Sequence, residues 1–156
     1  MKILAGQFKN HAIQSNKNFG YRPTTSIARK SIFDTLKSLE GRDFLDLYAG
    51  SGIVGFEAAS RGAKSVTFIE LEKKHMNQII VNAKEIAYNN FNFMIRDVNR
   101  FLKKSASYDV IFADPPYTDS NTNNLVTLCL DRLNKGGVFI LECKSHEFLA
   151  GYDKIS

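Results

Sequence analysis

The stretch that decides the fold is LDLYAGSGIVGFE, residues 45–57. It begins as an apolar strand, crosses a G-x-G-x-x-G loop at Gly50, Gly52 and Gly55, and continues as an apolar helix. Glycines at such a turn let the backbone approach a ligand, and the N–H groups at the start of the helix attract a negative group. The stretch therefore predicts a nucleotide-type cofactor site between the first core strand and its helix.

Strand-like and helix-like segments alternate around this loop. Strands are expected at 43–50, 65–70, 91–97, 108–114 and 138–144, and helices at 52–62, 73–88, 98–104 and 123–133. Residues 134–137, NKGG, are expected to form a turn before the last strand. Near-continuous apolar strands that alternate with amphipathic helices indicate an α/β fold with five parallel strands, covered on both faces.

The N-terminal segment differs from the rest in pattern and in charge. KILAGQF and HAIQS flank Lys9 and Asn10 and predict a β-hairpin, and a helix is expected from residues 24–26 to about Leu39. Residues 1–42 hold eight Lys or Arg and two acidic residues, a net charge of +6, whereas the remainder of the chain carries −1. A positive charge confined to one segment favours a polyanionic partner.

The composition excludes several classes of protein. No apolar run approaches the length of a membrane span, and the N-terminus has no apolar core long enough for a secretory signal, so the expected location is the cytoplasm. The two cysteines and three histidines are scattered singly, without the spacing of a metal site or a disulfide scaffold. We expect no metal.

Carboxylates placed around the glycine loop distinguish between cofactors. Glu70 ends the second strand, where it can accept the hydroxyls of a ribose, and this is compatible with both NAD and S-adenosylmethionine (SAM). Asp46, four residues before Gly50, would repel a pyrophosphate but suits the cationic groups of SAM. Asp97 can hold the adenine amine with Val98 beside the ring, or cap the helix that follows, or do both.

A second motif, ADPPY, ends the fourth strand at Asp114, Pro115, Pro116 and Tyr117. Prolines fix φ and lack an N–H group, so the Asp114 carboxylate and the Pro115 carbonyl form a rigid array of acceptors. Two acceptors can take the N–H groups of an aromatic amine and aim its lone pair at a methyl group. Tyr117 can stack on a base that has left its helix. The motif therefore predicts methylation of an exocyclic amine.

Together these blocks resemble the bacterial 16S rRNA guanine-N2 methyltransferases called RsmD. The resemblance rests on ILAGQFKNHAI, RPTTSIARKSIFDTL, FLDLYAGSGIVGFEAASRGAKSVTFIE and VIFADPPY, which span residues 3–117. It implies a Rossmann-like class I SAM-dependent methyltransferase fold, with three α-β-α layers and strand order 3-2-1-4-5. The family continues into a terminal strand pair, so we expect this pair to be shortened here. It also implies a monomer that methylates N2 of one guanine in small-subunit rRNA, within the subunit or an assembly intermediate, and leaves S-adenosylhomocysteine.

The resemblance assigns roles by position. It divides the chain into a basic hairpin extension at 1–20 and a methyltransferase domain at 21–156. The implied cofactor contacts are Asp46, Ala49, Gly50, Ser51, Gly52, Glu70, Leu71, Asp97, Val98 and Asp114; the catalytic loop is Asp114, Pro115, Pro116 and Tyr117; the RNA contacts are Lys2, Lys9, Arg22, Pro23, Thr24 and Arg29.

Other functions remain to be separated from this one. A DNA adenine-N6 or cytosine-N4 methyltransferase would also use an acid-Pro-Pro-aromatic turn, but it normally needs a sizeable target-recognition region. A non-catalytic ribosome-assembly protein that binds RNA would not need an intact catalytic loop. An NAD-dependent oxidoreductase is disfavoured because no hydride-transfer constellation is evident.

Overall fold

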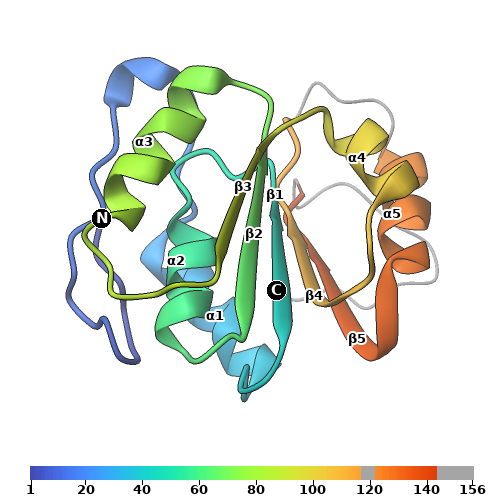
Figure 1. The fold of residues 1–156 in the computed structure, drawn as a ribbon, viewed down its shortest axis with the longest axis horizontal. Coiled ribbons are helices and arrows are strands. Elements are labelled where there is room, and N and C mark those ends of the chain that lie inside the picture. The colour runs from blue at the N-terminus through green and yellow to red at the C-terminus, as the bar shows by residue number, and fades with distance from the viewer. Residues whose placement is uncertain (117–121, 144–156) are drawn as a thin grey trace.

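The structure, a computed structural model, describes residues 1–116 and 122–143, so Tyr117 lies outside the described residues. Its centre is a five-stranded parallel sheet with the order β3-β2-β1-β4-β5 (Figure 1). The strands are β1 (Asp43–Leu47), β2 (Ser65–Glu70), β3 (Phe91–Ile95), β4 (Tyr108–Ala113) and β5 (Leu133–Leu141). The helices are η1 (Lys17–Phe19), α1 (Ser26–Leu36), α2 (Ile53–Ser60), α3 (Lys73–Ala83), α4 (Val98–Lys104) and α5 (Thr122–Asp131).

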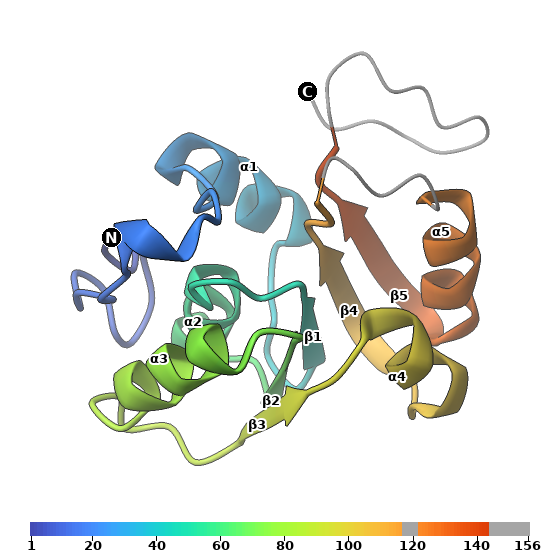
Figure 2. The ribbon, with the colours of Figure 1, turned by 90° about the horizontal axis from the view of Figure 1, so that it is seen from above.

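The helices cover both faces of the sheet, which confirms the predicted three-layer α/β fold. Helices α1, α2 and α3 lie on one face and α4 and α5 on the other (Figure 2). Successive residues of β1 alternate between the two layers, with Phe44 in one core cluster and Leu45 and Leu47 in the other. This two-sided burial explains why the strands read as almost continuous apolar runs.

The glycine loop joins the carboxyl end of β1 to the start of α2. Gly50 and Gly52 have positive φ angles of 55° and 79°, a backbone conformation that side chains with a Cβ rarely adopt. Gly52 is also the N-cap residue of α2, so the turn delivers the chain directly into the helix. The predicted strand-loop-helix context of the motif is therefore confirmed.

The N-terminal hairpin is present only in reduced form. Lys2 and Ala12 form an isolated antiparallel bridge, and backbone hydrogen bonds join Ile3 to His11 and Asn10, but neither arm extends as a strand. The predicted antiparallel pairing of the arms is therefore present but short, and the loop between the arms also bonds to α2: the Gln7 N–H donates to the Ser60 carbonyl at 2.8 Å.

Several other boundaries also differ from the prediction. Helix α1 ends at Leu36 rather than Leu39, because Lys37 takes a positive φ of 59°. Helix α3 ends at Ala83, five residues before Tyr88. The NKGG segment, residues 134–137, belongs to β5, whose register against β4 shifts between Tyr108 and Val110, as at a β-bulge. Among the described residues no helix is long and apolar enough to cross a membrane.

Candidate active site

Three acidic residues mark the carboxyl edge of the sheet. Asp46 lies near the end of β1, Glu70 ends β2, and Asp114 directly follows β4. Parallel strands bring their carboxyl ends to the same edge, where α/β proteins bind their ligands. Burial raises the pKa of Asp46 well above its usual range, the N–H of Gly55 opposes this shift, and the charges of Asp114 and Glu70 raise the pKa further. The edge therefore gathers acidic groups, and their repulsion opposes the ionisation of Asp46.

Asp46 is fastened to the helix that follows the glycine loop. Its carboxylate accepts a hydrogen bond from the Gly55 N–H at 2.9 Å, and its side chain is almost wholly buried. The sequence suggested that Asp46 meets the cofactor directly or through the amides of the loop. The structure shows the contact with a backbone amide of α2.

Glu70 holds the glycine loop from the neighbouring strand. Its Oε2 accepts the Gly50 N–H at 2.8 Å, and its Oε1 accepts the Glu72 N–H at 3.1 Å. The same Oε1 lies 3.3 Å from Nδ1 of His75. A carboxylate offers about four acceptor positions, and these three contacts occupy three of them. Roughly one position therefore remains for a ligand, which is too few to accept both hydroxyls of a ribose.

Residues 19–21, at the end of η1 and just after it, lie over this loop. A Cβ built on Gly50 would lie 3.6 Å from the Tyr21 ring, so that ring covers the turn. The rings of Tyr21 and Phe19 contact the His75 imidazole at centroid distances of 4.8 and 5.1 Å, and Nε2 of His75 lies 3.2 Å from the Phe19 carbonyl oxygen. His75, read from the sequence as an ordinary structural residue, thus joins this segment to Glu70.

The other predicted cofactor residues have mixed environments. Asp97 is exposed and is the N-cap residue of α4, where it accepts the Arg100 N–H at 3.0 Å, and Val98 beside it is buried. The capping role is confirmed, and the contact with adenine stays a prediction. Leu71 is 62% exposed at the open edge of the site. Of the remaining two, Ser51 is buried and Ala49 is half-buried within the loop.

Asp114 has a second carboxylate beside it that the sequence did not single out. Burial and the nearby charge of Glu142 raise the pKa of Asp114 to about 7. Glu142 follows β5, and its N–H donates to the Ala113 carbonyl at 2.9 Å. Pro115 is buried and Pro116 is exposed. A glutamate after an apolar strand resembles any surface residue, so only the pairing of β4 with β5 reveals this neighbour.

Thr24 reaches Glu142 from the N-terminal side. It is buried, and its hydroxyl donates to Oε2 of Glu142 at 3.4 Å. Burial raises the pKa of Glu142, and this hydrogen bond opposes the shift. The sequence suggested that Thr24 contacts RNA, but its side chain is directed into the site, toward the carboxylate.

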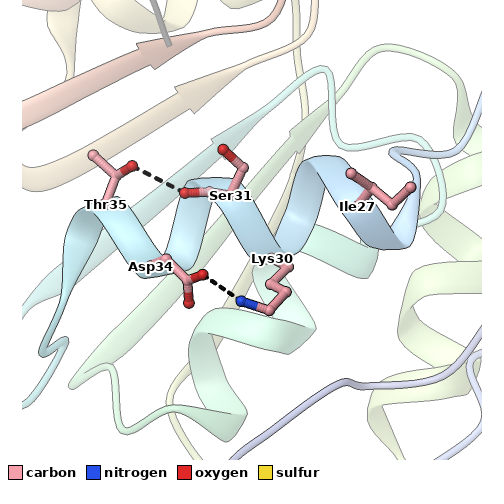
Figure 3. Close-up of a pocket in the computed structure, with 5 residues that line it drawn as sticks. All are labelled: Ile27, Lys30, Ser31, Asp34 and Thr35. Carbon is pink, nitrogen blue, oxygen red and sulfur yellow. Dashed lines mark hydrogen bonds and ion pairs between the residues drawn. The ribbon is translucent and has the colours of Figure 1, made fainter. Parts of the chain in front are cut away.

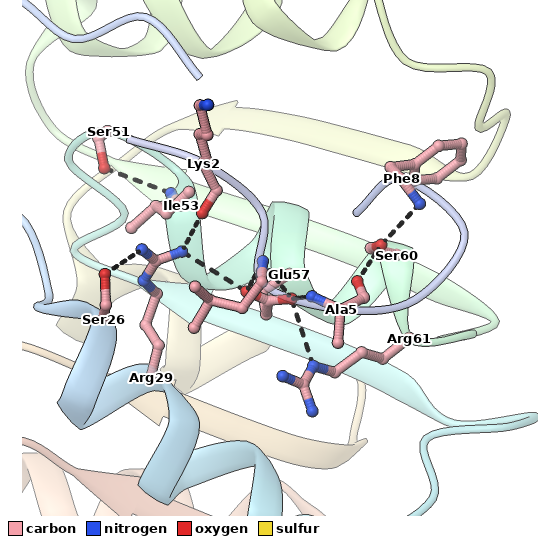
Figure 4. Close-up of polar contacts among 11 residues, drawn as sticks. Lys2, Ala5, Phe8, Ser26, Arg29, Ser51, Ile53, Glu57, Ser60 and Arg61 are labelled. Carbon is pink, nitrogen blue, oxygen red and sulfur yellow. Dashed lines mark hydrogen bonds and ion pairs between the residues drawn. The ribbon is translucent and has the colours of Figure 1, made fainter. Parts of the chain in front are cut away.

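Arg29, also expected to contact RNA, is an interior residue. Its side chain is 2% exposed; Nη1 donates to the Lys2 carbonyl at 2.9 Å and lies 3.5 Å from Oε1 of Glu57 (Figure 4). Glu57 is fully buried in α2 and also accepts the N–H groups of Leu4 and Ala5. The assignment of Arg29 to the RNA surface was wrong, because its buried guanidinium contacts the Lys2 carbonyl and the Glu57 carboxylate, and so links the N-terminal loop to α2.

A surface hollow of about 450 Å³ lies away from this edge, along α1. It is lined by Ile27, Lys30, Ser31, Asp34 and Thr35, and Lys30 pairs with Asp34 at 2.6 Å (Figure 3). None of the predicted cofactor or catalytic residues lines it. We assign it no role.

The residues at the sheet edge fit SAM as a cofactor. Burial, together with the charges of Asp114 and Glu70, raises the pKa of Asp46, so its ionised form is costly. A ligand with a sulfonium and an ammonium group relieves that cost. A pyrophosphate would increase it. These carboxylates therefore agree with the prediction from Asp46 that the cofactor is SAM and not NAD.

Comparison with known proteins identifies the family. The family model described as "Conserved hypothetical protein 95" matches residues 1–155. A ribosomal RNA small subunit methyltransferase D of Buchnera aphidicola is 35% identical over 129 residues, which are 81% of this chain and 68% of that protein.

Solved structures agree with this match. A putative methyltransferase, yhhF, from Escherichia coli superposes with a TM-score of 0.85 at 26% identity, covering 97% of this chain and 86% of that one. The putative methyltransferase SMU.776, complexed with SAH, shares the fold, with a TM-score of 0.69 at 21% identity over 86% of this chain and 38% of its own. This chain belongs to the conserved hypothetical protein 95 family, that of the RsmD-like class I methyltransferases, which use SAM as methyl donor.

Proposed function

We propose that this protein transfers a methyl group from SAM to the exocyclic N2 amine of one guanine in small-subunit ribosomal RNA. The observation that carries the proposal is the position of Asp114-Pro115-Pro116, at the same sheet edge as the glycine loop and Asp46. The names of the relatives support ribosomal RNA of the small subunit as the substrate.

The chemistry follows from the acceptors of this loop. Bound SAM supplies an electrophilic methyl group. The Asp114 carboxylate and the Pro115 carbonyl each accept one N–H of the guanine amine, which directs the nitrogen lone pair toward the methyl carbon. The N–C bond forms as the C–S bond breaks, S-adenosylhomocysteine leaves, and the carboxylate stabilises the positive charge on nitrogen until its proton departs.

The cofactor contacts are proposed from the loop outward. Gly50, Ser51 and Gly52 carry the backbone that approaches SAM, and Ala49 and Leu71 flank it. Glu70 contributes its remaining acceptor position to the ribose, and Asp97 with Val98 meets the adenine. Asp46 holds the start of α2 in place by accepting the hydrogen bond from the Gly55 N–H. Its carboxylate also favours the cationic groups of SAM electrostatically.

The RNA is proposed to reach the site over the N-terminal side. Lys2, Lys9, Arg22 and Pro23 are exposed, in contrast to Arg29 and Thr24. The loop that carries Lys2 and Lys9 is attached to α2 through Glu57, so it presents these charges from a fixed position. Phosphate contacts of this kind position an RNA without specifying its sequence.

The test uses SAM with a labelled methyl group and substrates that separate the possible targets. Small subunits, naked small-subunit rRNA and duplex DNA are each taken from cells that lack the corresponding modification. Label is expected in the ribosomal RNA and not in DNA, and the comparison of subunits with naked rRNA identifies the form that the protein accepts. Transfer to DNA adenine or cytosine alone would refute the proposal.

A further inference from the structure

Two carboxylates lie side by side where the target base must enter. The last paired residues of β4 and β5 are Ala113 and Leu141, and the Glu142 N–H continues the ladder by donating to the Ala113 carbonyl at 2.9 Å. Asp114 and Glu142 are therefore the next residues on neighbouring parallel strands. The charge of Glu142 also contributes to the raised pKa of Asp114, as expected of close neighbours.

Glu142 also has a hydrogen-bond partner from the N-terminal part of the chain. The hydroxyl of buried Thr24 donates to its Oε2 at 3.4 Å, which fixes the carboxylate from the segment that precedes α1. The Glu142 side chain is half-buried and lies one residue beyond the end of β5. A partly desolvated acid next to the catalytic acid costs stability and therefore calls for a ligand that compensates it.

Guanine offers two adjacent donors that match this pair. Its Watson–Crick edge carries the N1–H beside the N2 amine, whereas adenine has an unprotonated N1 acceptor beside its N6 amine, and cytosine an N3 acceptor beside its N4 amine. The Asp114 carboxylate and the Pro115 carbonyl already accept both N–H groups of the amine, so the second carboxylate is available for the neighbouring ring N–H. A carboxylate facing a ring nitrogen lone pair is repelled, so the same arrangement rejects the other amino bases.

We propose that Glu142 is a specificity-determining residue: its carboxylate accepts the N1–H of the target guanine while Asp114 accepts an N2–H. Thr24 is the positioning residue that holds Glu142 for this contact. The inference rests on the proposed function, because it assigns the base read at the site where Asp114 acts. It also gives Glu142 a role that adenine-N6 and cytosine-N4 enzymes with a similar loop would not require.

The test compares guanine with 2-aminopurine, which keeps the N2 amine but has an unprotonated N1. The modified guanine is first mapped by mass spectrometry, and 2-aminopurine is then placed at that position by splinted ligation of the rRNA. We expect the wild type to prefer guanine in kcat/KM by on the order of ten- to hundredfold. Glu142→Gln should methylate the 2-aminopurine RNA faster than the wild type does, because the Gln amide can donate to N1.

Two further variants keep this test decisive. Thr24→Val should shift the preference in the same direction by a smaller factor, and it leaves Glu142 itself in place. Glu40→Gln, which alters an exposed glutamate before the amino end of β1, at the opposite end of that strand from the site, should leave the preference unchanged. An unchanged preference in both Glu142→Gln and Thr24→Val, with SAM binding intact, overturns the role of Glu142 and leaves guanine methylation standing. Absence of transfer to guanine by the wild type overturns the proposed function, and this inference with it.

Discussion

The Gly55 N–H donates to the Asp46 carboxylate at 2.9 Å, which ties the strand before the glycine loop to the helix after it. The third glycine of the motif is therefore part of the packing between α2 and the sheet. A Cβ at Gly55 would lie 2.3 Å from Cε1 of Phe68 and 3.0 Å from Cγ1 of Val66. The loop geometry depends on this close approach as much as on the positive φ angles of Gly50 and Gly52.

Gly55→Ala is expected to lower the free energy of unfolding by about 1–3 kcal/mol, because overpacking moves the Phe68 ring within a closed core. Chemical denaturation measures the loss. The double variant Gly55→Ala/Phe68→Leu should lose less than the sum of the two single variants, since the smaller side chain makes room for the methyl group. Strict additivity would show that the steric explanation is wrong.

Asp114→Asn is expected to reduce kcat by on the order of a hundredfold or more, because a neutral amide cannot stabilise the charge that develops on the amine. SAM affinity, measured by calorimetry, should stay within about threefold, since the cofactor contacts lie mainly in the glycine loop. Asp131→Asn, an exposed residue at the end of α5, is the matched control and should behave as the wild type. A parallel loss of SAM affinity would assign Asp114 to cofactor binding instead.

The rate should increase with pH through neutrality. Burial and Glu142 raise the pKa of Asp114 to about 7, and only the ionised carboxylate accepts both the N–H bond and the developing charge well. The wild-type kcat/KM is therefore expected to be low at pH 5.5 and to level off above about pH 8, by ordinary titration of a single acid. In Asp114→Asn the residual activity should no longer increase with pH over this range. A wild-type profile that is flat between pH 5.5 and 8 contradicts the assignment.

Glu57→Gln is expected to release the N-terminal loop. The Glu57 carboxylate accepts the Leu4 N–H at 2.8 Å and the Ala5 N–H at 3.2 Å, and it offsets the buried charge of Arg29. Hydrogen exchange at these two amides should accelerate by about tenfold or more, because a neutral amide is a weaker acceptor than the carboxylate and holds these half-buried N–H groups less firmly. Glu40→Gln should leave the exchange unchanged. Equal protection in Glu57→Gln would mean that other contacts hold the loop.

The parts of this molecule that could be predicted are those with a local signal. The glycine loop, the alternation of apolar strands and helices, and Asp114 at the end of a strand each read directly from neighbouring residues. The strand order followed from the family resemblance, and the observed sheet agrees with it.

The parts that were missed depend on contacts between distant segments. Arg29 resembles a surface cation until α1 and α2 bring it against Glu57, and Glu142 gains its importance only from the pairing of β5 with β4. The hairpin is shorter than predicted for the same reason: only its first residues pair across the arms, and the loop between them bonds to Glu57 and Ser60 of α2. His75 carried no motif, and its position between Glu70 and Phe19 comes from the packing of α3.

The most direct measurement is mass spectrometry of the nucleosides from small-subunit rRNA after incubation with SAM and the protein. We expect one N2-methylguanosine per rRNA molecule with the wild type and a strongly reduced yield with Asp114→Asn. Methylation of adenine, or of a ring nitrogen of guanine, would contradict it. So would a yield that does not depend on Asp114.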